Sequence, residues 1–155
     1  MTSTERHLNY HRIQLRQLWN SEALRRPPLF RRKLVERQKS LMTVIRLPNG
    51  GYRIYAKGAS EIVLSRCSYI LGKDGELTPL GDGQKAEMTK TVIEPMASDG
   101  LRTIGLAYKD FVPENAARNE VLMTGDINWD DEETIRDAMV AIAVVGLQKE
   151  RNNNP

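Results

Sequence analysis

Cysteine, histidine and long apolar runs are scarce in this chain of 155 residues, and each shortage excludes a class of protein. The single cysteine, Cys67, cannot form an intrachain disulfide framework, and we interpret it as a small buried group on a helix. The two histidines, His7 and His11, lack the cysteine and histidine spacing of a metal site. No stretch reaches the roughly 18 apolar residues of a transmembrane helix, and the N-terminus lacks the apolar core of a secretory signal.

Charge is distributed unevenly along the chain, although the net charge is only +3. Residues 1–39 carry ten Lys or Arg against three Asp or Glu, which gives +7, and residues 40–155 carry thirteen against seventeen, which gives −4. We therefore separate residues 1–37, a basic leader that is helical or poorly ordered, from a domain over residues 38–147 and a frayed tail over 148–155.

The leader's apolar residues recur loosely at helical intervals among its arginines. This pattern fits three alternatives, namely a helix packed on its own domain, a helix at a membrane surface, or an organellar targeting segment. A nucleic-acid partner is not expected, because no aromatic residues interleave with the arginines.

Strand signals dominate the domain. The stretches "LMTVIRL" and "YRIYAK" flank the turn sequence "PNGG", which predicts a β-hairpin. Alternation places Tyr52, Ile54 and Ala56 on one face of the second strand. The turn residues Lys73, Asp74 and Gly75 fit a second tight hairpin, and "LRTIGLAYKDF" and "AIAVVGL" read as further strands.

Three helices are expected between these strands. Ser60 is the expected N-cap of a helix over "EIVLSRCSYI". A longer helix covers residues 84–97, with a kink or early stop at Pro95. A third begins at Asp130 or Asp131. The predicted fold class is α+β, with a mainly antiparallel sheet flanked by helices.

Lys57 lies between the second hairpin strand and the first predicted helix, in the stretch "AKGAS". Gly58 removes side-chain bulk beside it, and the N–H groups at a helix start attract anions, so one interpretation is an anion site. The alternative is an ordinary surface lysine on a turn. The sequence has no Walker glycine loop and no nucleophile elbow, and the acids of "WDDEET" are interpreted as the start of a helix rather than metal ligands.

Three separated stretches favour a ligand-binding role for Lys57 over an ordinary surface lysine. They are "KSLMTVIRLPNGGYRIYAKGASEIVLSRC", "IEPMASDGLRTIGLAYKDF" and "AIAVVGL". In their order and spacing they resemble the P-type calcium-transporting ATPases, most closely the plasma-membrane, calmodulin-regulated type. The resemblance covers roughly residues 38–147, and it implies part of the cytoplasmic nucleotide-binding domain of such a pump.

The resemblance also implies a role for five residues. Lys57 would line the bottom of an adenine pocket with Gly58 beside the base, and Ile104 would supply an apolar pocket contact. Lys39 would contact the nucleotide, and Arg102 would reach its phosphates through a guanidinium that can bind two oxygens. The implied ligands are ATP or ADP, with Mg²⁺ in the full-length family but no metal site in this chain.

The sequence also departs from the family pattern. The family has a stacking phenylalanine where this chain has Leu34, and an arginine where it has Gln38; loss of the ring would cost about 1 kcal/mol. The phosphorylation motif D-K-T-G-T, the motif G-D-G-x-N-D and the membrane helices are missing, and hydrolysis in this family passes through an aspartyl phosphate.

These departures predict a fragment that contributes adenine and phosphate contacts without turning over ATP or moving calcium by itself. Its partners would be ATP or ADP and the rest of the pump, at the cytoplasmic face of the plasma membrane, although the chain alone is expected to be soluble. The alternative function is a non-catalytic remnant or interaction module whose basic leader binds a membrane or a protein.

Overall fold

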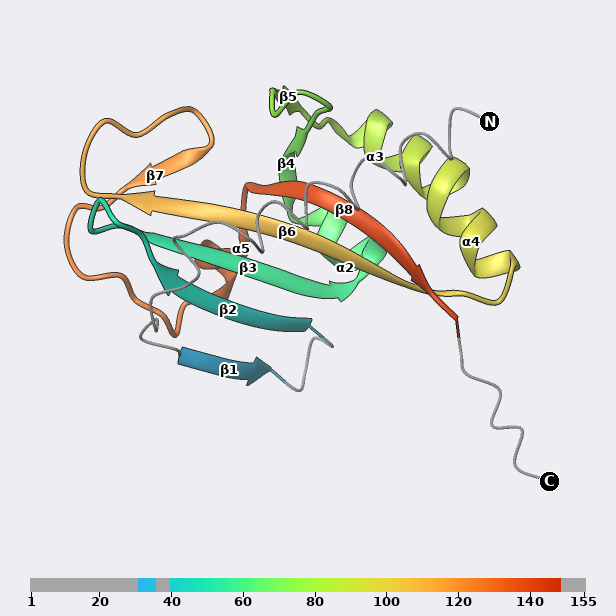
Figure 1. The fold of residues 1–155 in the computed structure, drawn as a ribbon, viewed down its shortest axis with the longest axis horizontal. Coiled ribbons are helices and arrows are strands. Elements are labelled where there is room, and N and C mark those ends of the chain that lie inside the picture. The colour runs from blue at the N-terminus through green and yellow to red at the C-terminus, as the bar shows by residue number, and fades with distance from the viewer. Residues whose placement is uncertain (1–30, 36–39, 149–155) are drawn as a thin grey trace.

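The computed structural model describes residues 31–35 and 40–148. Within them, one sheet of eight strands has the order β1-β2-β3-β6-β8-β4-β5, with β7 paired to β6 (Figure 1). The strands are β1 Arg31–Val35, β2 Ser40–Arg46, β3 Tyr52–Ala59, β4 Cys67–Leu71, β5 Leu77–Pro79, β6 Arg102–Val112, β7 Glu120–Leu122 and β8 Met139–Leu147. The helical segments are α2 Ser60–Ser65, α3 Asp82–Met88, the π-helical turn η3 Thr89–Ile93, α4 Glu94–Ser98 and α5 Glu132–Arg136.

Antiparallel pairing prevails in this sheet, and only the β4–β8 and β6–β7 pairs are parallel among the described strands. The predicted α+β class is therefore confirmed. β1 lies within the segment interpreted as a leader, so the sheet begins upstream of residue 38. The other residues of that leader, 1–30 and 36–37, and the tail from residue 149 onward lie outside the described residues. No helix of the described ranges is long and apolar enough to cross a membrane.

The predicted hairpin is present as β2 and β3. Its turn is closed by a hydrogen bond from the Leu47 amide to the Gly51 carbonyl at 2.8 Å, and Gly50 adopts a φ of +85°, which favours glycine. Ile54 and Ala56 are buried while Lys57 is exposed, so the expected alternation holds. The second predicted hairpin is also present, as β4 and β5.

The first predicted helix is too long. α2 ends at Ser65, and Cys67–Leu71 forms β4, which lies between β8 and β5 and gains ladder hydrogen bonds on both edges. A short apolar run satisfies helical and strand patterns equally, and here pairing with β8 decides the outcome. Ser60 is also not the cap: the N-cap is Ala59, and the Ser60 hydroxyl instead lies 2.7 Å from the Thr103 hydroxyl.

The helix does not stop at Pro95, so the predicted early stop is wrong. The π-helical turn η3 leads directly into α4, in which Pro95 occupies the first turn, and the helix continues to Ser98. The helix ends at Asp99-Gly100, where Gly100 has a φ of +78° and the Leu101 amide donates to the Met96 carbonyl at 3.0 Å.

The helical face of the sheet carries the core. One cluster packs beneath α2 and the α3–α4 helix, and the other packs beside α5; their members include Ala56, Val63, Ile93 and Met139, and Met42, Ile54, Phe111 and Ile135, respectively. Gly105 admits α2 to this face, because a Cβ there would lie 2.9 Å from the Val63 Cβ. The predicted cap of α5 is confirmed, with the Thr134 amide donating to Asp131 Oδ1 at 3.3 Å.

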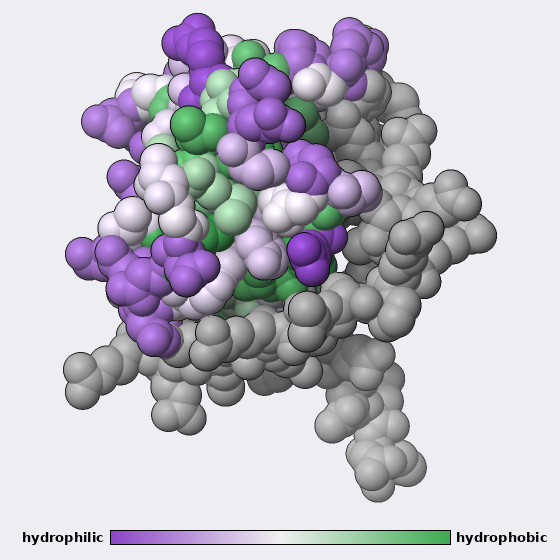
Figure 2. Space-filling model, turned by 90° about the vertical axis from the view of Figure 1, so that its left-hand side faces the viewer, coloured by the Kyte–Doolittle hydropathy of each residue, from purple (hydrophilic) through white to green (hydrophobic). Residues whose placement is uncertain are grey.

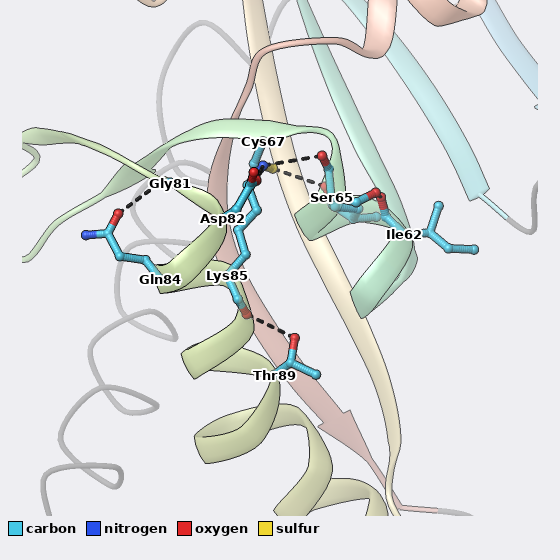
Figure 3. Close-up of polar contacts among 9 residues, drawn as sticks. Ile62, Ser65, Cys67, Gly81, Asp82, Gln84, Lys85 and Thr89 are labelled. Carbon is cyan, nitrogen blue, oxygen red and sulfur yellow. Dashed lines mark hydrogen bonds and ion pairs between the residues drawn. The ribbon is translucent and has the colours of Figure 1, made fainter.

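Polar contacts tie α3 to the end of α2 (Figure 3). Lys85 Nζ lies 3.6 Å from Asp82 Oδ1 and donates to the Ser65 carbonyl at 3.5 Å. At the start of α3, the Gly81 amide donates to Gln84 Oε1 at 2.8 Å. These contacts hold the longer helix over one edge of the helical face, away from the opposite face on which Lys57 lies.

Candidate functional site

Lys57 and Ile104 lie on the face of the sheet opposite the helices, where β3 ends and β6 begins. Lys57 pairs with Leu106, and Ala59 pairs with Ile104. Because alternate residues of a strand share a face, these four positions lie on the same face. We call each set of residues paired across neighbouring strands a row, so Lys57 and Leu106 form one row, and Ala59 and Ile104 form the next. Side chains in neighbouring rows lie about 7–8 Å apart, so Lys57 and Ile104 can contact one ligand.

Arg102 extends this face by one further row. It begins β6, two residues before Ile104, and is exposed. The four-residue separation between Leu106 and Arg102 corresponds to about 13 Å along the strand. An exposed lysine and an exposed arginine therefore flank the half-buried Ile104, which suits an elongated ligand with a flat apolar part and an anionic part.

Gly58 points to the other face. It pairs with Gly105, whose missing side chain admits Ser60 and Val63 of α2. The start of α2 thus packs against the face opposite the Lys57 ammonium, which does not support the interpretation that helix and lysine address one anion together. What Gly58 offers a ligand on the Lys57 face is its backbone.

Register brings the remaining site positions close to Lys57. Leu34 of β1 pairs with Leu41 of β2, and Leu41 pairs with Lys57, so Leu34 stands in the same cross-strand row as Lys57. Lys39 lies outside the described residues, but Ser40, which follows it, pairs with Gly58. Segments that are far apart in the sequence thus converge at one end of the sheet.

An ion pair on this same face was missed by the sequence reasoning. Arg53 donates to both carboxylate oxygens of Asp110, at 2.6 and 2.7 Å, and its guanidinium lies 4.6 Å from the centre of the Tyr108 ring. Burial by itself would lower the pKa of Arg53, but its hydrogen bonds to Asp110 and Tyr55 raise it, so the group stays charged. Strand alternation predicts the face of Arg53, but its partner lies 57 residues away.

Neither a metal-ligand cluster nor an accessible cysteine is found among the described residues. No group of three or more His, Cys, Asp or Glu among them could hold a metal ion. Cys67 is buried as expected, although at a strand start rather than on a helix, and burial raises the pKa of its thiol to about 12. An apolar pocket of about 510 Å³ lies on the helical face beside α3, and neither Lys57 nor Arg102 lines it.

Comparison with known proteins places this geometry in context. A family model described as P-type ATPase, cytoplasmic domain N, matches residues 20–151, beginning inside the segment interpreted as a leader. Plasma membrane calcium-transporting ATPase 2 of Oreochromis mossambicus is 50% identical over 111 residues, which are 72% of this chain and 9% of that protein. Human plasma membrane calcium-transporting ATPase 4 is 47% identical over 111 residues, again 72% of this chain and 8% of the relative.

A more distant relative gives the same result. Plasma membrane calcium-transporting ATPase mca-1 of Caenorhabditis elegans is 41% identical over 120 residues, covering 72% of this chain and 10% of that protein. The chain therefore spans a tenth or less of the length of these three relatives.

Proposed function

The chain belongs to the family of P-type ATPase cytoplasmic N domains, and from that premise we propose that it binds ATP or ADP across the end of its sheet. The observation that supports this most is the register, which aligns Lys57, Ile104 and Arg102 along one face. The base would lie on the Lys57 stem and Ile104, beside the Gly58 backbone. Arg102 would bind the phosphates, and Lys39 would add a contact from outside the described residues.

The residue types suit this division of labour. A lysine stem presents an apolar surface to a base while its ammonium stays in water, whereas a guanidinium presents paired donors to phosphate oxygens. Leu34 offers no ring for stacking in the Lys57 row, so affinity is expected to be weak. ATP would bring its own Mg²⁺, since the described residues include no metal-holding cluster.

In a longer protein that contains this sequence, the domain would present nucleotide to a phosphorylated aspartate elsewhere. This chain has no D-K-T-G-T motif, so we propose binding without turnover. Calcium transport, the membrane helices and a position at the cytoplasmic side of the plasma membrane would belong to that longer protein.

Titration of the ¹⁵N-labelled chain with ADP tests the proposal. The amides of Lys57, Gly58 and Arg102 are expected to shift while that of Leu77 in β5 stays in place. Arg102→Gln removes a charge-assisted hydrogen bond worth about 1.5–3 kcal/mol, so it should weaken ADP binding about tenfold to a hundredfold. Adenosine, which has no phosphate, should bind this variant and the unchanged chain equally.

Lys90→Gln is the matched control, because it removes an exposed cation from the helical segment η3. It should leave ADP binding unchanged. If the amides around Lys57 and Arg102 do not move at saturating ADP, the proposed site is wrong.

A further inference from the structure

A second hollow lies at the opposite end of the sheet from the candidate nucleotide site. We call it the end pocket; its cavity volume is about 300 Å³ and its apolar lining is Phe111, Val121, Leu122, Met123, Ile127 and Ile135. Leu122 is 49% exposed, a large apolar side chain left in water. Figure 2 shows this end of the molecule, with apolar surface in green surrounded by polar side chains in purple.

The rim of the end pocket is acidic. Residues 113–133, which include the pocket's loops, contain seven Asp or Glu and one Arg, a net charge of −6. Asp126 and Asp131 line the pocket itself. Hydrogen bonds from Thr134 lower the pKa of Asp131, so its carboxylate remains charged well below neutral pH. An apolar hollow with this rim fits a partner that is apolar and basic, and it repels an anionic membrane surface.

The same chain contains a segment of that chemistry. Residues 6–26 carry five arginines and one glutamate, a net charge of +4, together with the apolar residues Leu8, Ile13, Leu15, Leu18, Trp19 and Leu24. On a helix, Leu8, Leu15, Leu18 and Trp19 would fall within one stripe about 100° wide, whereas Ile13 and Leu24 would fall on the opposite side.

The segment also leads into β1 at the end of the sheet that carries the end pocket. Arg31 pairs with Val44, close to the Leu47–Gly51 turn, and Tyr52 next to that turn pairs with Phe111 of the pocket. Three strand spacings separate β1 from β6, which is about 14 Å. From residue 26 to Arg31 there are five Cα–Cα steps, which span about 17 Å when extended, so the linker is long enough to cross these strands without any change in the sheet.

We propose that the end pocket binds residues 6–26 of the same chain, with side chains of the Leu8, Leu15, Leu18 and Trp19 stripe in the hollow and arginines of the segment against the acidic rim. This contact holds the segment that leads into β1, the edge strand that carries Leu34 into the Lys57 row. The contact requires no nucleotide, so a negative result for nucleotide binding would not argue against it.

Paramagnetic broadening in the full chain tests this contact. A nitroxide is attached to Ser21→Cys; Cys67 does not react, because it is buried and its thiol pKa is about 12. The amides of Leu122, Thr124 and Asp126 should lose most of their intensity, while those of β5 keep theirs. A nitroxide on Ser98→Cys, at the exposed end of α4, should leave the end pocket untouched.

Two variants assign the broadening to the pocket. Leu122→Asp, at an exposed position, should restore the lost intensity, whereas the matched change Leu77→Asp in β5, where the leucine is 38% exposed, should not. The double variant Asp126→Asn with Glu133→Gln leaves the apolar lining intact and should restore part of the intensity. So should about 1 M salt, at which the Debye length falls to about 3 Å.

Three outcomes would overturn the proposal. The first is full intensity at Leu122 and Asp126 in the labelled chain. The second is broadening that Leu122→Asp and the charge variant both leave unchanged. The third is broadening of an unlabelled ¹⁵N chain by a spin-labelled second chain at the same concentration, which would assign the pocket to a neighbouring molecule instead.

Discussion

Buried single residues in this molecule have effects that can be measured one at a time, and Cys67 is the simplest. Its side chain is 1% exposed, and Sγ donates to the Val63 carbonyl at 3.2 Å. Burial disfavours the thiolate, which raises the pKa from 9.0 to about 12. The folded chain should therefore not react with a thiol reagent at pH 8, and reaction should appear when denaturant unfolds it.

The same thiol makes stability depend on pH in the alkaline range. The unfolded chain loses the Cys67 proton from about pH 9, and the folded chain loses it only near pH 12. Between these values the unfolded state binds fewer protons, so the free energy of unfolding should fall by up to about 1.4 kcal/mol per pH unit. Cys67→Ala should abolish this part of the slope in urea titrations; an unchanged slope would show that the thiol is not its source.

Gly105 sets how closely α2 approaches the sheet. A Cβ there would lie 2.9 Å from the Val63 Cβ and 3.2 Å from the Ser60 Cα, and the second contact is with backbone. Gly105→Ala should therefore destabilise the fold by about 1–3 kcal/mol in urea unfolding. Gly83→Ala is the control: no atom lies within 4 Å of its added Cβ in α3, so it should be neutral or stabilising by up to about 1 kcal/mol.

At the scale of elements, α5 is fastened to the sheet by a buried lysine. Lys109 is 5% exposed, and its Nζ donates to the carbonyls of Thr134 and Asp137 at 3.0 and 2.7 Å. Lys109→Met keeps the apolar stem but leaves two carbonyls without this donor, so we expect a loss of about 1–3 kcal/mol. Amide exchange should accelerate first in α5. The variant Lys90→Met, at an exposed position, should change the free energy of unfolding by no more than about 0.5 kcal/mol and should leave amide exchange in α5 unchanged.

The edge strand β1 governs a different property, which is solubility. It covers β2 along five paired residues, and an uncovered edge pairs readily with other chains. Deleting residues 1–37 should therefore lower the soluble fraction measured after centrifugation. Deleting only residues 1–30 keeps β1, so this shorter deletion should retain more soluble protein. Equal losses would show that β1 does not provide the protection.

Local pattern was enough for some elements and not for others. The hairpin could be predicted because "PNGG" and strict alternation act over a few residues. β4 could not, because Cys67–Leu71 is stabilised as a strand by β8, about 70 residues later, while its apolar spacing also suits a helix. The candidate site likewise depends partly on local sequence and partly on pairing between distant strands. Motifs predict a role for Lys57, Gly58 and Arg102, but only the register shows that Leu34 shares the Lys57 row.

At the scale of the whole molecule, the candidate site and the end pocket lie at opposite ends of the sheet and differ in the charges that line them. One end presents Lys57 and Arg102, while the other presents the acidic rim of the end pocket. We therefore expect an anionic nucleotide to favour the first end over the second. When the free ADP concentration is ten times the dissociation constant, binding should stabilise the fold by about 1.4 kcal/mol. This is measured as a rise in melting temperature. Arg102→Gln should reduce that rise at the same ADP concentration, and an undiminished rise would place the ligand elsewhere.

The position of β8 determines when the sheet can be completed during synthesis. β8 is the final strand of the described residues, yet it lies in the interior of the sheet between β6 and β4. Until residues 139–147 leave the ribosome, β4 and β5 have no described strand that joins them to β6. A growing chain therefore carries an incomplete sheet with an unpaired stretch of β6 edge and an uncovered Cys67 until residue 147 has left the ribosome, and during that interval aggregation and oxidation compete with folding.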